Sequence, residues 1–257
     1  MLQSIAERHK HILNRLSQTG KVSVMDLSAE LEVSAVTIRK DLKLLEDKNL
    51  LYRSHGIAIT QNPYVTDRHV TEKEKIRSEE KTQIAAKAAS LVDEKDYIIL
   101  ASGTTINEMA RQLRNHKHVT VISASLIASQ ILNANPDIEV IQLGGEIRKS
   151  SSSVVGPSAE RAFEIYNCNK LFLGVDGIDP EYGLTTTNAM EASLNKCMIK
   201  AAQKIIVLAD SSKLNRKGFG KICPIEQVDI LITDNAADQN TIKILEEKGI
   251  EVIIVEQ

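Results

Sequence analysis

Several short polar blocks of this sequence follow runs of apolar residues, where a β-strand would end. The first block is Ser102-Gly103-Thr104-Thr105, and a helical pattern comes after it. Small residues let backbone N–H groups approach an anion, the hydroxyls add donors, and the N-terminus of the next helix contributes a favourable dipole. By itself, Ser-Gly-Thr-Thr is more often an ordinary helix cap. Its position after a strand of an α/β pattern favours a phosphate site.

A second block, Gly174-Val175-Asp176-Gly177-Ile178-Asp179, carries two carboxylates. Asp176 and Asp179 stand three residues apart on an expected turn, where they could accept hydrogen bonds from sugar hydroxyls or act as an acid/base pair. The alternative is a turn in which the aspartates cap their own backbone. The sequence leaves both interpretations open.

Three more polar blocks end apolar runs. They are Gly144-Gly145-Glu146 with Arg148, Thr185-Thr186-Thr187-Asn188 with Glu191 downstream, and Ala209-Asp210-Ser211-Ser212-Lys213. Open α/β sheets bind ligands beyond the carboxyl ends of their strands, so the five blocks are expected to converge on one pocket, to which Lys213 would add a positive charge. The candidate ligand-binding residues are Ser102, Gly103, Thr104, Thr105, Arg148, Asp176, Asp179, Asn188, Glu191 and Lys213.

The apolar pattern of residues 78–257 predicts the elements that would position these blocks. Strands are expected at 97–101, 119–123, 138–143, 170–175, 204–209, 228–232 and 251–255. Helices are expected near 78–91, 106–114, 125–133, 158–165, 189–202 and 238–248. Strands that alternate with helices indicate βαβ units and a largely parallel sheet covered on both faces. We therefore predict an α/β fold for this part of the chain.

The first 60 residues have a different pattern, that of three short helices and two short strands. The apolar positions that would pack inside the helices are Ile5, Ile12, Leu13, Leu16, Val24, Leu27, Leu31, Ile38, Leu42 and Leu45. Ser34 can cap the third helix, and residues 50–53 and 57–60 would form two strands around a turn. This order predicts a winged helix-turn-helix over 1–60. Residues 61–77 lose the apolar periodicity and are rich in charge, so we predict a linker before the ligand-sensing domain at 78–257.

The third expected helix presents a cationic face opposite its buried stripe. A helix of this size fits the major groove of DNA, where its first residues meet base edges while cations neutralise phosphates. A charge cluster alone is more often a solvated helix face, but the cap, turn and wing in this order favour DNA binding. The candidate DNA-binding residues are Ser34, Val36, Thr37, Arg39, Lys40 and Lys43 on the helix, and Arg53 and His55 on the wing.

The composition excludes several classes of function. A net charge of −2 with 26% charged residues names no partner. The three cysteines have neither metal-ligand spacing nor an even number, so we expect no zinc site, no disulfide framework and a reducing cytoplasm. No apolar run approaches the roughly 18 residues of a membrane span, so we expect no membrane association. Only 3% of the residues are aromatic, which argues against base-stacking platforms for single strands.

One long pattern runs through residues 22–57, with Val33-Ser34, Thr37-Ile38-Arg39, Asp41-Leu42, and Arg53, His55 and Gly56 in order. This pattern closely resembles the N-terminal domain of the DeoR/GlpR family of bacterial repressors. Two positions depart from it. Lys40 stands where the family usually has arginine, which weakens any bidentate contact to guanine because lysine lacks the planar fork. Ile57 replaces the second glycine of the wing, which makes its tip stiffer.

The polar blocks of the larger part resemble the sensor domain of the same family. The matching motifs are Gly-Thr-Thr, Gly-Gly-Glu-x-Arg, Asp-Gly-Ile-Asp, Gly-Leu-Thr-Thr and Asp-x-Ser-Lys. The resemblance implies a fold like that of ribose phosphate isomerases and a sugar phosphate effector, with no cofactor. It places the phosphate at 102–105 and the sugar near Asp176, Asp179 and Glu191. The segments LFLGVDGID, GLTTTN and ADSSKLNR resemble most the branch that regulates amino-sugar use, such as that of N-acetylgalactosamine.

The resemblance also implies a repressor that binds operator DNA as a homo-oligomer, either a dimer or a tetramer. Two departures affect the presumed pocket. Ala101 stands where aspartate is common in the family, and Ala124 stands where asparagine is frequent. Both remove polar groups, so the effector is expected to differ from the best-known ones.

Two other functions fit parts of the sequence. The Asp-x-x-Asp pair with Glu191 would suit a sugar-phosphate isomerase or deaminase with an accessory head. The lysine-bearing loop that ribose isomerases carry after that pair is missing, because residues 180–190 contain no lysine, and kinship of fold does not carry activity. The winged helix could instead bind a protein, in which case its binding would lack the steep salt dependence of a DNA complex. We expect no enzymatic activity.

Overall fold

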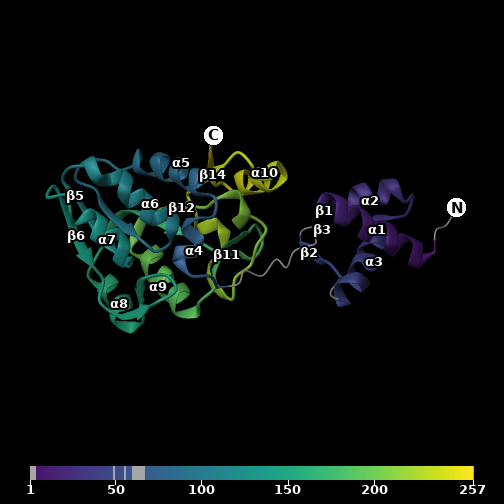
Figure 1. Ribbon diagram of the computed structural model, residues 1–257, viewed down its shortest axis with the longest axis horizontal. Helices are drawn as coiled ribbons and strands as arrows, with labels where there is room; N and C mark the ends of the chain where they lie inside the picture. The colour runs from purple at the N-terminus through teal and green to yellow at the C-terminus, as the bar shows by residue number, and fades with distance from the viewer. Residues whose placement is uncertain (1–3, 49, 55, 60–66, 257) are drawn as a thin grey trace. The chain divides into compact units, whose positions relative to one another are not determined.

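The computed structural model describes residues 4–48, 50–54, 56–59 and 67–256. The chain divides into two units, Met1–Tyr64 and Val65–Gln257 (Figure 1). The second unit therefore begins inside the segment 61–77 that we predicted as a linker. Its first described helix is α4 (Val70–Glu74), and the side chain of Val70 is buried. The linker prediction is wrong for residues 67–77, because a single apolar residue among charges has no periodicity yet can anchor a short helix.

The helices of the first unit begin and end at local caps. Its elements are α1 (Ile5–Thr19), β1 (Lys21–Ser23), α2 (Val24–Glu30), α3 (Ala35–Asp47), β2 (Tyr52–Ser54) and β3 (Ile57–Ile59). Ser4 and Glu7 form a capping box at α1, which ends at Gly20 with a φ of 72°, a left-handed conformation that favours glycine. Ser34 accepts a hydrogen bond from the Thr37 N–H and caps α3. The three predicted helices and the predicted cap of the third are confirmed.

Three short strands complete the winged helix-turn-helix. They form an antiparallel sheet in the order β1-β3-β2, with Ala58 of β3 paired to both Val22 and Arg53. The two wing strands were predicted, whereas β1 was not, because three residues between two helices are too few to show alternation. The core of the unit lies between the helices and this sheet and contains Ile12, Leu16, Leu27, Ile38, Leu42, Leu45, Leu51 and Ala58.

A buried ion pair fastens α3 to α1. Arg8 donates from Nε and Nη2 to the two carboxylate oxygens of Asp41, at 2.7 and 3.1 Å, and His9 lies 3.3 Å from the same carboxylate. Both side chains of the Arg8–Asp41 pair are more than nine-tenths buried. The pair is bidentate, so it fixes the rotation of α3 about its own axis as well as its distance from α1.

A seven-stranded parallel sheet forms the centre of the second unit. Its strands are β4 (Tyr97–Leu100), β5 (Val119–Ser123), β6 (Ile138–Gln142), β9 (Cys168–Gly174), β12 (Ala202–Leu208), β14 (Ile230–Asp234) and β15 (Glu251–Val255). They lie in the order β15-β14-β12-β9-β4-β5-β6, and every pairing is parallel. Each lies within about two residues of a predicted strand, so the predicted α/β class with a largely parallel sheet is confirmed.

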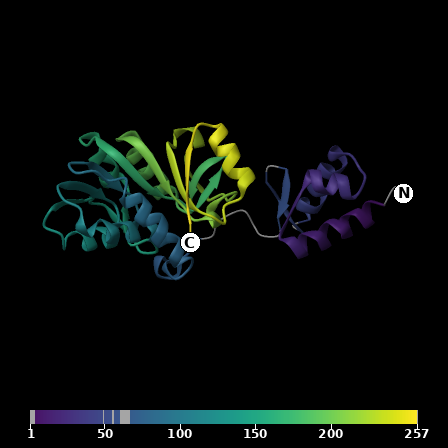
Figure 2. The ribbon, with the colours of Figure 1, turned by 90° about the horizontal axis from the view of Figure 1, so that it is seen from above.

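Helices cover one face of this sheet (Figures 1 and 2). They are α5 (Ser78–Ala89), α6 (Thr104–Gln112) and α7 (Leu126–Leu132). Alternate residues of a strand point to opposite faces, so Ile98 and Leu100 of β4 pack against these helices while Ile99 packs against the other face. The near-continuous apolar character of the strands follows from this burial on both sides.

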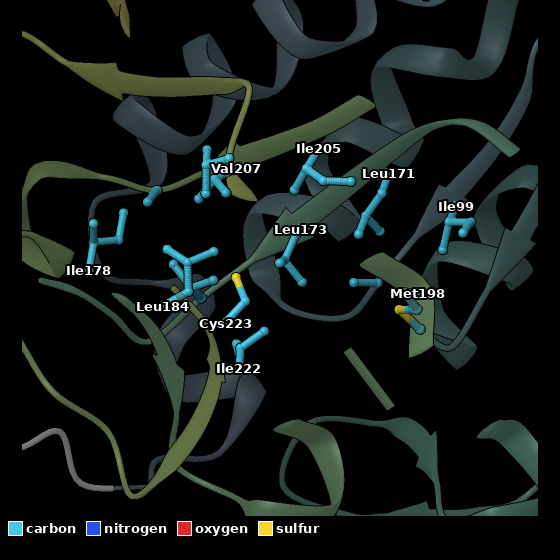
Figure 3. Close-up of a cluster of buried hydrophobic side chains, with 14 of the residues drawn as sticks. Ile99, Leu171, Leu173, Ile178, Leu184, Met198, Ile205, Val207, Ile222 and Cys223 are labelled. Atoms are coloured by element: carbon cyan, nitrogen blue, oxygen red, sulfur yellow. The ribbon is translucent and has the colours of Figure 1, made fainter. Parts of the chain in front are cut away.

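The other face carries helices and two small sheets. Its elements are α8 (Pro157–Arg161), α9 (Ala189–Lys200), α10 (Gln239–Glu247), the pair β7 (Glu146–Arg148) and β8 (Ser153–Val155), and the sheet β10 (Gly177–Asp179), β11 (Gly183–Thr186) and β13 (Gly220–Cys223). Figure 3 shows the core on this side, where Leu173 and Val207 of the main sheet meet Leu184, Ile222 and Cys223 of the small one. Among the described residues, no helix is long and apolar enough to cross a bilayer.

We expect Asp41→Ala to destabilise the first unit by about 3 kcal/mol, because it leaves the Arg8 guanidinium buried without its carboxylate. Amide hydrogen exchange of α1 and α3 in the full chain would measure the loss. Asp47→Ala, at an exposed position at the end of the same helix, serves as the control and should change the free energy of unfolding by less than about 0.5 kcal/mol. Equal exchange in the two variants would show that the ion pair does not hold the unit together.

Candidate functional site

The outer face of α3 carries the predicted DNA-binding side chains into solvent. Arg39, Lys40 and Lys43 are exposed, and 58% of Val36 is accessible. Ser34 lies at the N-terminus of the helix, where its Oγ is 3.0 Å from Oγ1 of the half-buried Thr37. The buried stripe on the opposite side and the Arg8–Asp41 ion pair hold this face outward.

The wing holds its arginine against α3. Arg53 donates from Nε to Glu46 Oε2 at 2.7 Å, and its backbone N–H donates to Glu46 Oε1 at 2.9 Å. The guanidinium is thus partly neutralised by a carboxylate of the neighbouring helix, and this contact was not predicted. His55, the other predicted wing residue, lies outside the described residues.

In the second unit, the loop after β4 leads directly into the N-terminus of α6. Gly103 is the residue before the helix and has a φ of 121°, a backbone conformation that strains any residue with a side chain. Thr104 and Thr105 begin the helix, two residues earlier than predicted. The free N–H groups of this first turn give the loop the polarity that an anion requires.

Ser102 connects this loop to α9. Its hydroxyl donates to Glu191 Oε1 at 3.0 Å, and the other oxygen of Glu191 lies 3.3 Å from Arg148 Nη1. Asn188 caps α9 by accepting hydrogen bonds from the N–H groups of Met190 and Glu191 at 2.9 and 3.0 Å, which positions the glutamate. Burial, together with the negative charge of Asp176, raises the pKa of Glu191 despite the nearby Arg148.

Asp176 is the second carboxylate of this network. Burial alone would raise its pKa, but the Lys73 ammonium, 2.8 Å from Oδ1, and hydrogen bonds hold the pKa below its usual value. The Thr186 hydroxyl and the Thr187 N–H donate to Oδ2 at 3.0 and 3.1 Å. The Asp176 carboxylate is therefore ionised and well satisfied in a nearly water-free position.

Asp67 joins the two halves of the network. Its carboxylate accepts from Arg148 Nη2 at 2.7 Å, from Thr187 Oγ1 at 3.1 Å and from Ser150 Oγ at 3.2 Å. A continuous chain of contacts thus runs from Ser102 through Glu191, Arg148, Asp67, Thr187 and Asp176 to Lys73. We call this chain the strand-end network, because it joins loops that follow β4, β9 and β11 to residues of α4, α9 and the β7–β8 hairpin.

Two further lysines, Lys81 and Lys213, lie near Lys73 at the end of the network. Lys81 donates to the carbonyl oxygens of Lys73 and Ile76 and is buried. Burial lowers the pKa of Lys81 to about 8, since the charges of Lys213 and Lys73 offset the attraction of Asp210. A polar cavity of about 200 Å³ adjoins this cluster and is lined by Glu74, Ser78, Lys81, Thr82, Thr104, Glu108 and Arg111.

Asp179 has a different role from Asp176. Its Oδ1 accepts from the N–H groups of Glu181 and Tyr182 at 3.1 and 2.8 Å, which caps the turn between β10 and β11, and Lys217 lies 3.4 Å from Oδ2. The sequence left two interpretations of the aspartates open. For Asp179, the structure supports the turn in which the carboxylate caps its own backbone. Its fully buried carboxylate is committed to the turn, so Asp176 and Asp179 do not form a pair facing one ligand.

The structure thus brings Ser102, Arg148, Asp176 and Glu191 into one network, and it leaves Asn188 as the cap that positions α9. Sequence reasoning missed five residues that contribute to it: Asp67, Lys73, Ser150, Thr186 and Thr187. The two threonines stood in a quoted polar block without an assigned role. Asp67 and Lys73 lay in the charged segment 61–77, where no periodic signal distinguished them from solvated residues.

These features define a class of protein, a transcription regulator with a winged helix-turn-helix and a ligand-sensing α/β unit. The DeoR-like helix-turn-helix domain matches residues 8–63, and the DeoR C terminal sensor domain matches residues 76–235. The chain belongs to the DeoR family of transcriptional regulators.

Curated relatives cover nearly the whole chain. A protein of Escherichia coli O157:H7, whose name describes it as a transcriptional repressor for the aga operon, is 38% identical over 97% of this chain and 94% of its own. The transcriptional regulator GlpR of Haloferax volcanii is 35% identical over 96% and 97%, and the repressor GlcR of Bacillus subtilis is 33% identical over 98% and 96%. These relatives are transcription regulators, not enzymes, in agreement with our expectation.

The solved ribose 5-phosphate isomerase A of Neisseria gonorrhoeae aligns over 52% of each chain, with 23% identity and a TM-score of 0.39.

The raised pKa of Glu191 predicts a pH dependence of stability. A carboxyl whose pKa is higher in the folded than in the unfolded state contributes stability below its unfolded pKa, and loses that contribution as pH rises through the folded value. We therefore expect the melting temperature of the wild type, relative to Glu191→Gln, to fall as the pH rises above the ordinary glutamate pKa of 4.5.

Glu226→Gln is the matched control, because the Lys248 hydrogen bond lowers the pKa of this exposed carboxyl. The contribution of Glu226 to stability is present above its unfolded pKa and is lost only as pH falls through its folded pKa. The melting temperature of Glu226→Gln should therefore change in parallel with that of the wild type as the pH rises above 4.5. Parallel melting curves for Glu191→Gln and the wild type would contradict the shift.

Proposed function

We propose that this chain represses a sugar-utilisation operon and that a phosphorylated sugar, bound in its second unit, controls its hold on operator DNA. The observation that carries the proposal is the position of Lys81. Lys81 lines the polar cavity together with Thr104, in the first turn of α6, and the charges of Lys73 and Lys213 disfavour its protonated form. A site that concentrates positive charge next to unpaired backbone N–H groups favours a dianionic ligand.

The phosphate is proposed to bind at residues 102–105, where Gly103 gives the backbone its open approach. Thr104 of this loop lines the polar cavity, and Lys81 lines the same cavity. The sugar would lie against Asp176, Glu191 and Arg148, whose oxygens and N–H groups suit hydroxyls. The likeness of the loop motifs to the amino-sugar branch supports an amino-sugar phosphate.

DNA binding is assigned to the outer face of α3. Arg39 and Lys40 lie in its first two turns, which is the part of a recognition helix that reaches base edges, and Lys43 would contact phosphates. Ser34, Val36 and Thr37 complete this surface, and Arg53 would approach the adjacent backbone. A homo-oligomer would present two such helices to the two halves of an operator, since paired half-sites mirror the symmetry of the protein.

Arg39→Ala should abolish the preference of the full chain for its selected DNA sites while leaving the fold intact, because a base contact carries sequence information that phosphate contacts lack. Duplexes selected from a random library by the wild type, compared with scrambled duplexes by fluorescence anisotropy at two salt concentrations, would measure the specificity ratio. Lys10→Ala, an exposed cation on α1, should leave that ratio unchanged. A full ratio in Arg39→Ala would refute the assignment of α3.

Sugar phosphates should raise the melting temperature of the full chain, because a ligand that binds only the folded state stabilises it by mass action. The panel would contain ribose 5-phosphate, glucosamine 6-phosphate, N-acetylgalactosamine 6-phosphate and the unphosphorylated sugars. Lys213→Gln should weaken binding of the active compound about tenfold, the equivalent of about 1.4 kcal/mol. Lys243→Gln, an exposed lysine on α10, is the control. Stabilisation by the free sugars alone would argue against a phosphate site.

A further inference from the structure

Asp67 occupies the position that an anionic ligand would take in the strand-end network. Its carboxylate oxygens accept hydrogen bonds from the guanidinium of Arg148 and from the hydroxyls of Thr187 and Ser150. A guanidinium with flanking hydroxyls is the donor set that proteins use for carboxylate and phosphate oxygens. The geometry thus contains an anion subsite whose present occupant belongs to the chain itself.

The two partners of this contact differ in how firmly they are held. Arg148 follows the short β7 strand, contacts Glu191 as well, and exposes only 10% of its side chain. Asp67 exposes 45% of its side chain and precedes the first helix of the unit. The subsite is therefore fixed, whereas its occupant stands at an accessible edge from which it can leave without disturbing the core.

Residues 67–74 have other contacts with the second unit besides that of Asp67, including the hydrogen bond from Lys81 to the Lys73 carbonyl oxygen. The Val70 N–H donates to the Ser150 carbonyl at 2.7 Å, the Val70 side chain is buried, and Lys73 pairs with Asp176. Of these partners, Asp176 is one of the residues against which we propose that the sugar lies, and Ser150 also donates to Asp67. A ligand in that position competes for the same donors that hold this segment.

We infer that Asp67 is an internal competitor of the effector. In the ligand-free chain its carboxylate occupies the subsite of Arg148, Ser150 and Thr187, and an oxygen of the bound sugar phosphate replaces it there. This inference rests on the proposed function and adds the regulation of the same site. Asp67 is the first described residue of the second unit, so effector binding changes the attachment of residues 67–74.

Thermodynamic linkage gives the direction of each effect. The apparent affinity for the effector is reduced by the fraction of molecules in which Asp67 fills the subsite, so removal of Asp67 raises that affinity. Coupling between two sites is reciprocal, so the same change should move the DNA affinity of the ligand-free protein toward the value that effector-saturated wild type shows. A residue that contacts the effector directly would have the opposite influence, because its removal lowers affinity.

The test compares wild type, Asp67→Ala and Asp93→Ala as full chains. Asp93 is a matched control, since it is an exposed carboxylate that pairs with Lys170 at the same 2.7 Å. Titration calorimetry would measure binding of the active member of the sugar phosphate panel, with inorganic phosphate as a second probe. Amide hydrogen exchange of residues 67–74 would follow the attachment of the segment with and without these probes.

We expect Asp67→Ala to bind the sugar phosphate about tenfold more tightly, the equivalent of about 1.4 kcal/mol, and to exchange faster at 67–74 without ligand. Saturating sugar phosphate should produce the same faster exchange in the wild type and in Asp93→Ala. Unchanged or weaker binding by Asp67→Ala, or binding that leaves exchange at 67–74 unaltered, would overturn the inference while the effector itself stands. Failure of every panel member to bind either protein would overturn the proposed effector, and the displacement with it.

Discussion

The structure of the second unit depends on the neutralisation of carboxylates that folding removes from water. Asp176 and Glu191 lie beyond the carboxyl ends of parallel strands, nearly without solvent, and an uncompensated charge there would cost several kcal/mol. Lys73 and Arg148 supply the compensation, and each comes from outside the main sheet. The requirement for these cations explains why a short helix from the charged segment and a small hairpin are packed against the loops of the sheet.

The first unit also contains a buried carboxylate, and a single ion pair neutralises it. Asp41 faces inward from α3 and meets Arg8 of α1, which fixes the helix so that Arg39 and Lys40 face solvent. A charge on the inner side of this helix thus orients the charges on its outer side. The outer surface of α3, which we propose to bind DNA, is thus oriented by a buried contact on the opposite side of the helix.

We propose that sensing uses the competing charges of the strand-end network. Arg148 is shared between two carboxylates, Glu191 has a raised pKa beside Asp176, and the charges of Lys73 and Lys213 help to lower the pKa of Lys81. In this proposal a dianionic ligand shifts the balance of these charges. Asp67, the first described residue of the second unit, would transmit the shift by leaving its contact with Arg148.

The sequence by itself determined the two classes of unit, the order of the strands and helices, the cap at Ser34 and the glycine at 103, because periodicity, capping and left-handed backbone are local properties. It also singled out Arg148, Asp176 and Glu191, which the structure brings into one network, since polar blocks that follow apolar runs must gather at one edge of a parallel sheet. Only the tertiary structure decided that Asp179 caps a turn and that Asp67 and Lys73 complete the network. The roles of Asp67 and Lys73 depend on pairings between residues 81 to 120 positions apart, which carry no periodic signal in the chain. The role of Asp179 is local, but its two interpretations could be separated only when its burial and partners were known.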